Sequence, residues 1–148
     1  MVPVEVLGLA VDVDLQSMVL LTPLGSHDRR RTIVPIWVGP DEAALLSIAL
    51  TGSSSSRPIT HDLLQNLVTA SNAVLDRVEI PRIENDVFLA ELHLSIGPER
   101  IVLDCRPVDA IALALRLDAP LFLAEAVLEE EGALEEVDED VDLSLIHI

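Results

Sequence analysis

Two stretches of the chain follow one plan, IWVGPDEAALLSIAL (36–50) and LDCRPVDAIALALRL (103–117). In each, apolar residues typical of a strand stop just before a proline, and apolar residues then recur at helical spacing. Proline suits the first position of a helix, because its missing N–H needs no partner there. The pairs that match are Pro40 with Pro107, Glu42 with Asp109, and Ala43 with Ala110. The sequence therefore predicts two strand–proline–helix units and suggests an internal duplication.

Further strands and helices are expected around these two units. Alternating apolar residues predict strands at about 3–14, 17–22, 32–38, 74–80, 86–96, 100–105 and 121–123. A change of phase at Gly8 indicates a bulge, and Pro35 confines its strand to an edge or a bulge. Helical spacing predicts helices at about 41–51, 61–73, 107–117 and 124–131. The sequence thus predicts an α+β (α/β) fold, a single compact domain whose mixed β-sheet packs against about four helices.

The second of these helices has a predicted start and a predicted buried face. Thr60 is expected as its N-cap, with Asp62 in the first turn, where a carboxylate favours the positive end of the helix dipole. Its apolar residues recur at helical spacing and predict one buried face, made of Leu63, Leu64, Leu67 and Val68.

Length and charge suggest one domain and a tail. The 148 residues fit a single domain, assigned to residues 1–133. Residues 134–148 begin with an acidic run and lack Phe, Trp and Tyr, which predicts a disordered tail. The net charge is −17, and residues 1–124 alone hold 16 acids against nine arginines. Such a surface disfavours nucleic acid as a partner unless arginines cluster locally.

Composition excludes several kinds of chemistry. Lysine is absent, which excludes a phosphate-binding P-loop and covalent lysyl intermediates. Cys105 is the single cysteine, which excludes an internal disulfide and a cysteine-rich zinc site. Aromatic residues are too few for base-stacking platforms. We see neither a signal peptide nor a membrane-length apolar run, so we expect a cytoplasmic protein with no membrane partner.

Arginine stands directly before proline at two expected helix starts, Arg57-Pro58 and Arg106-Pro107. A helix start presents unpaired N–H groups to anions, and a guanidinium binds phosphate oxygens in pairs. Arg57, Thr60 and Arg106 are therefore candidate phosphate-binding residues. The alternative is ordinary helix capping with surface ion pairs, which explains such patterns equally well.

Phosphodiester hydrolysis needs a base, charge neutralisation and a leaving-group acid. His61 lies in a first helical turn, where the dipole disfavours the protonated ring and suits a general base. Asp62 and Asp109 are the other candidate catalytic residues. Glu42 is a candidate ligand for a divalent metal, Mg²⁺ or Mn²⁺, both of which prefer oxygen. A histidine without a catalytic role is an equally good interpretation of His61.

Two other histidines have simpler interpretations. His27 lies in a turn beside Arg29, Arg30 and Arg31, the densest basic run of the sequence. His93 and Glu91 are two residues apart on one expected strand, a spacing that suits a surface pair more often than a metal site.

Four blocks in order resemble the bifunctional nuclease (BFN) domain family: VPIWVGPDEA (34–43), RPITHDLL (57–64), FLAELHL (88–94) and RPVDAIALALR (106–116). The similarity spans roughly residues 3–132. The family's Arg-Pro-Thr/Leu-Thr-His-Asp block is matched at Arg57, Pro58, Thr60, His61 and Asp62, and its Arg-Pro-Ser-Asp-Ala block at Arg106, Pro107, Asp109 and Ala110. Val108 stands where the family usually has serine. If that hydroxyl bound phosphate, this chain lacks it.

The resemblance implies a small α/β protein, often dimeric, that acts on RNA and DNA. Our first hypothesis is a nuclease of low sequence specificity with nucleic acid as its substrate. The second is a non-catalytic regulatory or phosphate-ligand-binding domain that dimerises. Self-association as a homodimer or higher homo-oligomer would use the apolar helix 107–117 and free strand edges. Arginines converging on one groove would favour the nuclease, and scattered arginines would count against it.

Overall fold

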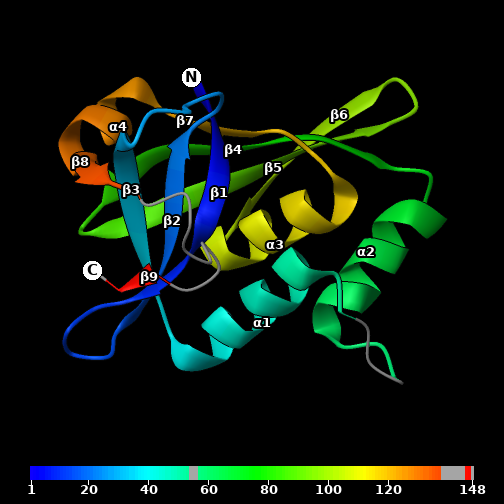
Figure 1. The fold of residues 1–148 in the computed structure, drawn as a ribbon. Coiled ribbons are helices and arrows are strands. Elements are labelled where there is room, and N and C mark those ends of the chain that lie inside the picture. Colours follow the sequence, from blue (N-terminus) through cyan, green and yellow to red (C-terminus); the bar gives the residue numbers. More distant parts are fainter. Residues whose placement is uncertain (54–56, 138–145, 148) are drawn as a thin grey trace.

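A computed structural model describes residues 1–53, 57–137 and 146–147 and shows a mixed sheet with helices on its faces (Figure 1). The helices are α1 (Pro40–Thr51), α2 (Thr60–Ala70), α3 (Pro107–Leu117) and α4 (Glu125–Glu131). The strands are β1 (Val2–Val11), β2 (Ser17–Pro23), β3 (Arg30–Val38), β4 (Val74–Glu84), β5 (Val87–Ile96), β6 (Glu99–Cys105), β7 (Leu121–Leu123), β8 (Ala133–Glu136) and β9 (Ile146–His147). The predicted α+β single domain is confirmed.

Strand order in the described part of the chain is β6-β5-β4-β7-β1-β2-β3-β8. Neighbours in this order are antiparallel except β4 and β7, which run parallel, and β9 pairs in parallel with β1 beyond the end of β7. The sheet is therefore mixed, as predicted. The register of β1 on β2 shifts between Val6 and Gly8, which confirms the bulge.

Pro35 lies where β3 is an edge among the described strands. It pairs with Leu20 of β2 on one side, whereas β8 reaches only Arg30 to Ile33 on the other. A proline has no N–H to donate to a second neighbour, so its place at this edge follows from its chemistry.

Helix α3 is the centre of the main core. It begins at Pro107 directly after β6, as α1 begins at Pro40 after β3, so both strand–proline–helix units form. Both α1 and α2 pack on α3, and α3 packs on β4 and β5. Six of its side chains are buried, those of Val108, Ala110, Ile111, Ala112, Leu113 and Ala114. The interior is thus a three-layer contact of sheet, α3 and outer helices.

The start of α2 differs from the prediction. Ile59, not Thr60, is the N-cap, and Thr60 is the exposed first residue of the helix. The side chain of Asp62 reaches back, and its Oδ2 accepts a hydrogen bond of 2.8 Å from the Ile59 N–H. The carboxylate of Asp62, the third residue of the helix, therefore satisfies the N–H of the N-cap residue itself.

The predicted buried face of α2 is half wrong. Leu64 and Val68 pack against the main core, but Leu63 and Leu67 are each 55% exposed. The helix lies at the rim of the core, and its main contacts are with α3 and β4. A narrow contact of this kind buries one row of side chains rather than a broad stripe.

Strand β8 begins at the last residue of the expected domain, Ala133, and extends into the stretch expected to form the acidic tail. Residues 133–136 pair with β3, so that Glu136 lies opposite Arg30 and Glu135 opposite Arg31. The following Val137 is buried in a second, smaller core on the other face of the sheet, with Met18, Leu20 and Ile33. Opposite charges across the strands and one apolar anchor explain this pairing. The rest of the expected tail, 138–145 and 148, lies outside the described residues.

Val108, which replaces the serine usual in the family, faces the main core and is 2% exposed. We expect Val108→Ser to lower the free energy of unfolding by about 1–3 kcal/mol, because a hydroxyl would replace buried methyl groups. Urea denaturation would measure this loss. The matched control is Val87→Ser on β5, where valine is 57% exposed; its effect should stay within about 0.5 kcal/mol. An equal effect of both changes would contradict the burial of Val108.

Candidate functional site

The first turns of α2 and α3 meet through a histidine and an aspartate. His61 is 2% exposed, and its Nε2 lies 2.9 Å from Oδ1 of Asp109. The proline that starts α3 places Asp109 in the first turn, facing the start of α2. Two of the three predicted catalytic residues are therefore in contact, although 48 residues separate them in the chain.

Arg106 completes this contact from the residue before α3. Its Nε donates to Asp109 Oδ2 at 2.8 Å and its Nη2 donates to Oδ1 at 3.1 Å. Burial opposes ionisation of Asp109, but the hydrogen bonds from Arg106 and His61 lower its pKa below the ordinary 3.8. The hydrogen bonds to Asp109 and its negative charge in turn raise the pKa of Arg106. The Arg106 side chain is 63% exposed, so a surface ligand can reach it.

The ring of His61 has one bonded and one buried nitrogen. Because Asp109 is an acceptor, Nε2 carries the proton and donates it. Nδ1 is buried and has no hydrogen-bond partner among the described residues. A solvent water cannot reach Nδ1 in this arrangement, so the ring acts on the site through Asp109.

The first turn of α1 lies near the same place. Glu42 Oε1 accepts a hydrogen bond of 3.3 Å from the Gly39 N–H, which caps α1. The charge of Glu42 also contributes to the raised pKa of Arg106, so the starts of α1 and α3 are electrostatically coupled. Arg106 thus interacts with acids in the first turns of α1 and α3, whereas Asp62 in the first turn of α2 lies beside the C-terminal end of α1, near Gly52.

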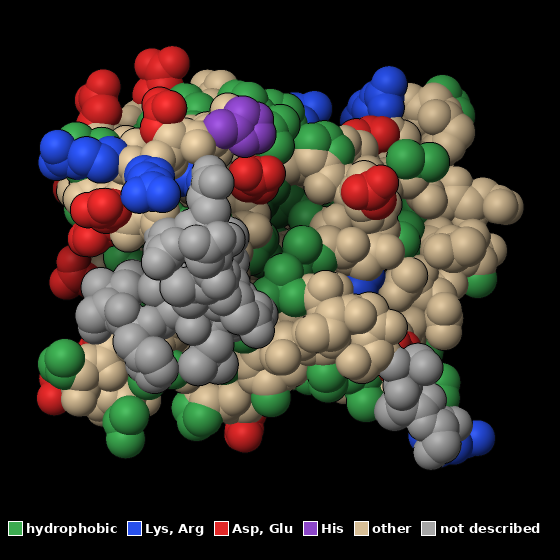
Figure 2. Space-filling model, in the orientation of Figure 1, with side chains coloured by type: hydrophobic (Ala, Val, Ile, Leu, Met, Phe, Trp, Pro, Cys, Tyr) green, Lys and Arg blue, Asp and Glu red, His purple; other side chains and the backbone are tan. Residues whose placement is uncertain are grey.

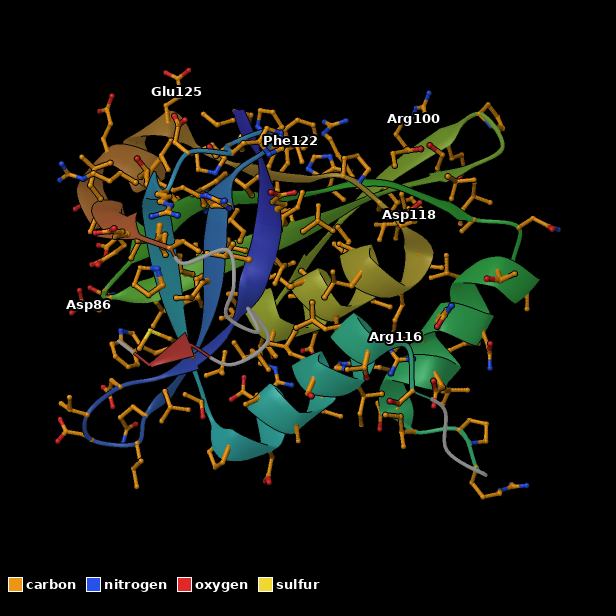
Figure 3. All side chains as sticks on the ribbon, in the orientation of Figure 1. Asp86, Arg100, Arg116, Asp118, Phe122 and Glu125 are labelled. Atoms are coloured by element: carbon orange, nitrogen blue, oxygen red, sulfur yellow. The ribbon has the colours of Figure 1, made fainter. Side chains whose placement is uncertain are left out.

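Asp62, the third predicted catalytic residue, faces a different partner. Its Oδ1 accepts a hydrogen bond of 2.5 Å from Nη1 of Arg116, whose side chain is 8% exposed. Arg116 extends from α3 toward the beginning of α2 (Figure 3). The bond from the Ile59 N–H and that from Arg116 lower the pKa of Asp62. Asp62 therefore links α2 to α3 through an ion pair. Its buried partner, Arg116, was not among the residues expected from the sequence.

The remaining predicted phosphate ligands lie at the surface. Arg57 and Thr60 are exposed, Arg57 three residues before the start of α2 and Thr60 at its first position. The structure therefore brings together the side chains of His61, Arg106 and Asp109. The charge of Glu42 acts on Arg106.

Arginines do not gather into one groove. On the face in Figure 2 the Lys/Arg colour appears in separate places, several of them beside acidic side chains. Five arginines are ion-paired with carboxylates, namely Arg77, Arg82, Arg100, Arg106 and Arg116. Arg31 is nearly buried and its Nε donates to the Asp28 carbonyl at 2.6 Å. By the criterion set from sequence, this scatter counts against a broad nucleic-acid groove.

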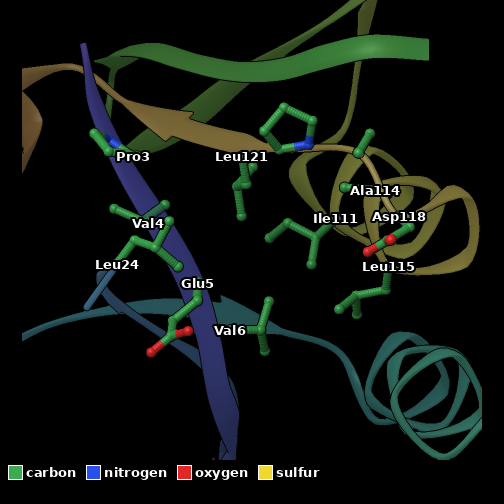
Figure 4. A pocket seen from close by; sticks show the side chains of 12 residues that line it. Pro3, Val4, Glu5, Val6, Leu24, Ile111, Ala114, Leu115, Asp118 and Leu121 are labelled. Carbon is green, nitrogen blue, oxygen red and sulfur yellow. The ribbon is translucent and has the colours of Figure 1, made fainter. Parts of the chain in front are cut away.

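An apolar pocket between β1 and the end of α3 is a poor place for phosphate. Its lining includes Val4, Ile111 and Leu121, and two carboxylates, Glu5 and Asp118, also lie on it (Figure 4). Negative side chains repel a phosphate group at close range. The helix starts around Arg106 are therefore the better site for an anion.

Cys105 is excluded as a nucleophile. It is the residue just before Arg106 and is half-buried. Burial, with Asp109 and Asp104 nearby, raises the pKa of its thiol to about 11. The thiol therefore stays protonated at neutral pH, and the thiolate is the reactive form.

One group of side chains could hold a metal ion, and it lies away from these helix starts. Glu79 on β4 and Glu91 and His93 on β5 each offer a ligand atom within 4.8 Å of the others, among the residues that the structure describes. The spacing in the sequence pairs Glu91 with His93, but it gives no sign that Glu79 belongs to the same group. The register of the β4–β5 hairpin would have revealed it, because Glu79 lies directly opposite Glu91.

The fold and this site agree with a family match. The model of the bifunctional nuclease domain matches residues 23–136, so the chain belongs to the bifunctional nuclease domain family. The matched range includes the starts of α1, α2 and α3. No helix in the described part of the chain is long and apolar enough to cross a membrane.

Relatives of the chain include bacterial and plant proteins. An uncharacterized protein of Mycobacterium tuberculosis is 36% identical over 139 residues, which cover 93% of this chain and 81% of the relative. Bifunctional nuclease 2 of Oryza sativa subsp. japonica is 27% identical over 72% of this chain, and Bifunctional nuclease 2 of Arabidopsis thaliana is 26% identical over 74%. The chain spans only 34% of the length of each plant protein.

The pKa of Asp109 predicts how stability depends on pH. Because its folded pKa is lowered below 3.8, ionised Asp109 stabilises the fold above that pH, and the stabilisation is lost as the folded carboxylate is protonated. We expect Asp109→Asn to be less stable than the parent near pH 7 and the difference to shrink toward about pH 3. Urea unfolding at several pH values measures it. A difference that is independent of pH would mean that charge is not involved.

Proposed function

We propose that the protein is a nuclease that hydrolyses phosphodiester bonds in RNA, DNA or both with low sequence specificity. The observation that carries the proposal is the carboxylate of Asp109, held at once by buried His61 and exposed Arg106. Membership in the bifunctional nuclease domain family and the two plant relatives named as nucleases support it. A site that contacts phosphate rather than bases reads no sequence.

Arg106 has the first role. A substrate phosphate competes with Asp109 for its guanidinium, which binds phosphate oxygens in the same paired geometry as a carboxylate. Phosphate binding thus places positive charge on the reacting group and frees one side of Asp109. Exposed Arg57 and Thr60, which precede and begin α2, are proposed to hold the neighbouring phosphate.

Asp109 and His61 then act as a unit. Without Arg106, the pKa of Asp109 rises, because the hydrogen bonds and the positive charge of Arg106 that lower it are gone. Asp109 takes a proton from the attacking water, and the hydroxide oxygen forms a bond to phosphorus. The bond from phosphorus to the leaving oxygen breaks, and solvent protonates that oxygen. His61 keeps Asp109 oriented through its Nε2–H, and Asp62 holds α2 in place through Arg116.

The predicted Mg²⁺ or Mn²⁺ does not fit this arrangement. Both oxygens of Asp62 and of Asp109 accept hydrogen bonds from the protein, and Glu42 Oε1 caps α1. Arginine occupies the position beside Asp109 that a metal would take. No step of the proposed reaction is therefore assigned to a metal. The cleavage assay compares activity in Mg²⁺, Mn²⁺ and chelator.

A binding domain is the second candidate. The scatter of ion-paired arginines and the burial of His61 Nδ1 favour a non-catalytic regulatory domain that holds a phosphorylated ligand at Arg106. Such a domain needs the anion site without a base. It would keep phosphate binding and lack any cleavage.

Self-association and location complete the proposal. Because the apolar side chains of α3 are buried within one chain, that helix cannot drive self-association as expected from sequence. We propose a homodimer formed instead through β6, an edge strand among those described, with Val102 and Leu103 exposed. We also propose a cytoplasmic location, because a chain with a single cysteine forms no internal disulfide.

Cleavage assays test the proposal directly. Full-length protein is incubated with labelled single-stranded RNA or duplex DNA, in Mg²⁺, Mn²⁺ or chelator. We expect Arg106→Ala and Asp109→Asn each to lower the rate by at least about 100-fold, the range typical of lost charge stabilisation or proton transfer.

The matched control is Arg82→Ala. Arg82 is 62% exposed and its Nε lies 2.7 Å from a nearby carboxylate, much like Arg106, but it lies on β4. Its variant should cleave at the parental rate. Cleavage unchanged in Arg106→Ala would place the activity elsewhere. No cleavage by the parent in any condition, with phosphate binding that depends on Arg106, would support the binding domain.

A further inference from the structure

The face of β4, β5 and β6 turned away from the helices carries a row of acids. Ala90, Leu92 and Leu94 of β5 are buried on the helix side, so the alternating Glu91 and His93 lie on the opposite face. In the register of the sheet, Glu91 is directly opposite Glu79 on β4 and Asp104 on β6. Three carboxylates from three strands thus lie side by side.

Such a row is unfavourable without a cation. Like charges directly opposite each other destabilise an antiparallel pair, and partial burial strengthens the repulsion. The Glu79 side chain is 12% exposed and that of Glu91 is 31% exposed. Arg77 donates from Nε to Glu79 Oε2 at 2.7 Å, which offsets one charge of the row.

His93 faces this row with a nitrogen that has no hydrogen bond. Its Nε2 lies 2.8 Å from Glu79 Oε2 and 3.7 Å from Glu91 Oε1, and the side chain is 18% exposed. Despite the short distance, Nε2 is buried and has no partner of hydrogen-bond geometry among the described residues. A buried ring nitrogen left in this state costs free energy, whereas a cation bound between it and the carboxylates would use its lone pair.

We propose that Glu79, Glu91 and His93 bind one divalent transition-metal ion, of which Zn²⁺ is the test case. Their ligand atoms lie within 4.8 Å of one another, close to the spacing of donors around one ion. An imidazole donor favours Zn²⁺ and similar ions over Mg²⁺ or Ca²⁺, which prefer oxygen alone. Arg77 orients Glu79, and Asp104 adds negative charge beside Glu91.

The ion joins β4 to β5 and leaves coordination positions open to solvent. Three protein ligands are fewer than the four of a closed structural zinc site, so water completes the shell. The site is on the opposite face of the sheet from His61 and Asp109, and is therefore independent of the proposed nuclease reaction.

Calorimetric titration of the full-length, chelator-treated protein with Zn²⁺ tests the site. We expect one bound ion per chain, with affinity lowered at least about tenfold in Glu91→Gln and in His93→Gln. The matched control is His27→Gln, which removes an exposed histidine outside the cluster. Its affinity should equal that of the parent. Weak binding by other acids of the chain would be unaffected by all three changes.

Thermal unfolding separates binding from a structural role. With chelator, Glu91→Gln should melt at the same temperature as the parent or higher, because it removes a like charge from the row. With Zn²⁺, the parent should gain stability and the variant should not. Absence of a tight Zn²⁺ equivalent, or equal affinity in His93→Gln, would overturn the proposal and leave the cluster as a salt bridge.

Discussion

The burial of α3 between the sheet and two other helices is the constraint on which the remaining structure depends. Its apolar side chains lie almost all round the helix, so it is stable only when covered on more than one side. β4 and β5 cover one side, and α1 and α2 cover others. Because α1 and α3 follow the same strand–proline pattern, this packing also gathers helix starts, and with them polar first-turn residues, around Arg106.

Polar groups within this packing must find partners, and they do so across helices. His61 is buried where α2 crosses α3, and Asp109 supplies an acceptor for it. The next residue of α2, Asp62, binds the nearly buried Arg116. Each pair joins α2 to α3 at a different point, so α2 is fixed by two charge-assisted contacts although half of its apolar row is exposed. The first of these contacts, between His61 and Asp109, also belongs to the candidate functional site.

The two faces of the sheet have different chemistry. The helix face combines a dense apolar core with one ionic site at its edge. The other face has a small second core over β1, β2 and β3, closed by Val137, and is polar over β4 and β5. The face over β4 and β5 is partly open to solvent, so it can accommodate the carboxylates and His93. A nucleic-acid site and a metal site would therefore be separated by the thickness of the sheet.

The sequence alone predicted the four helices and strands β1 to β7 in their order, but not β8 or β9. Proline positions, alternation and helical spacing act over a few residues, so the two strand–proline–helix units, the bulge at Gly8 and the edge position of Pro35 could be read directly. Four short blocks in order, at 34–43, 57–64, 88–94 and 106–116, also indicated the family. Where a boundary depended on a side chain several positions away, as at Ile59 and Thr60, the local pattern was insufficient.

Only the tertiary structure decided which polar residues meet. His61 and Asp109 are 48 residues apart, and Asp62 and Arg116 are 54 apart, so no periodicity connects them. Their contacts follow from how α2 lies across α3, which depends on packing of the whole core. Glu79 joined Glu91 and His93 for the same reason, since strand register is a property of two strands together. Local propensity belongs to one segment of chain, whereas a site belongs to the fold that brings distant segments together.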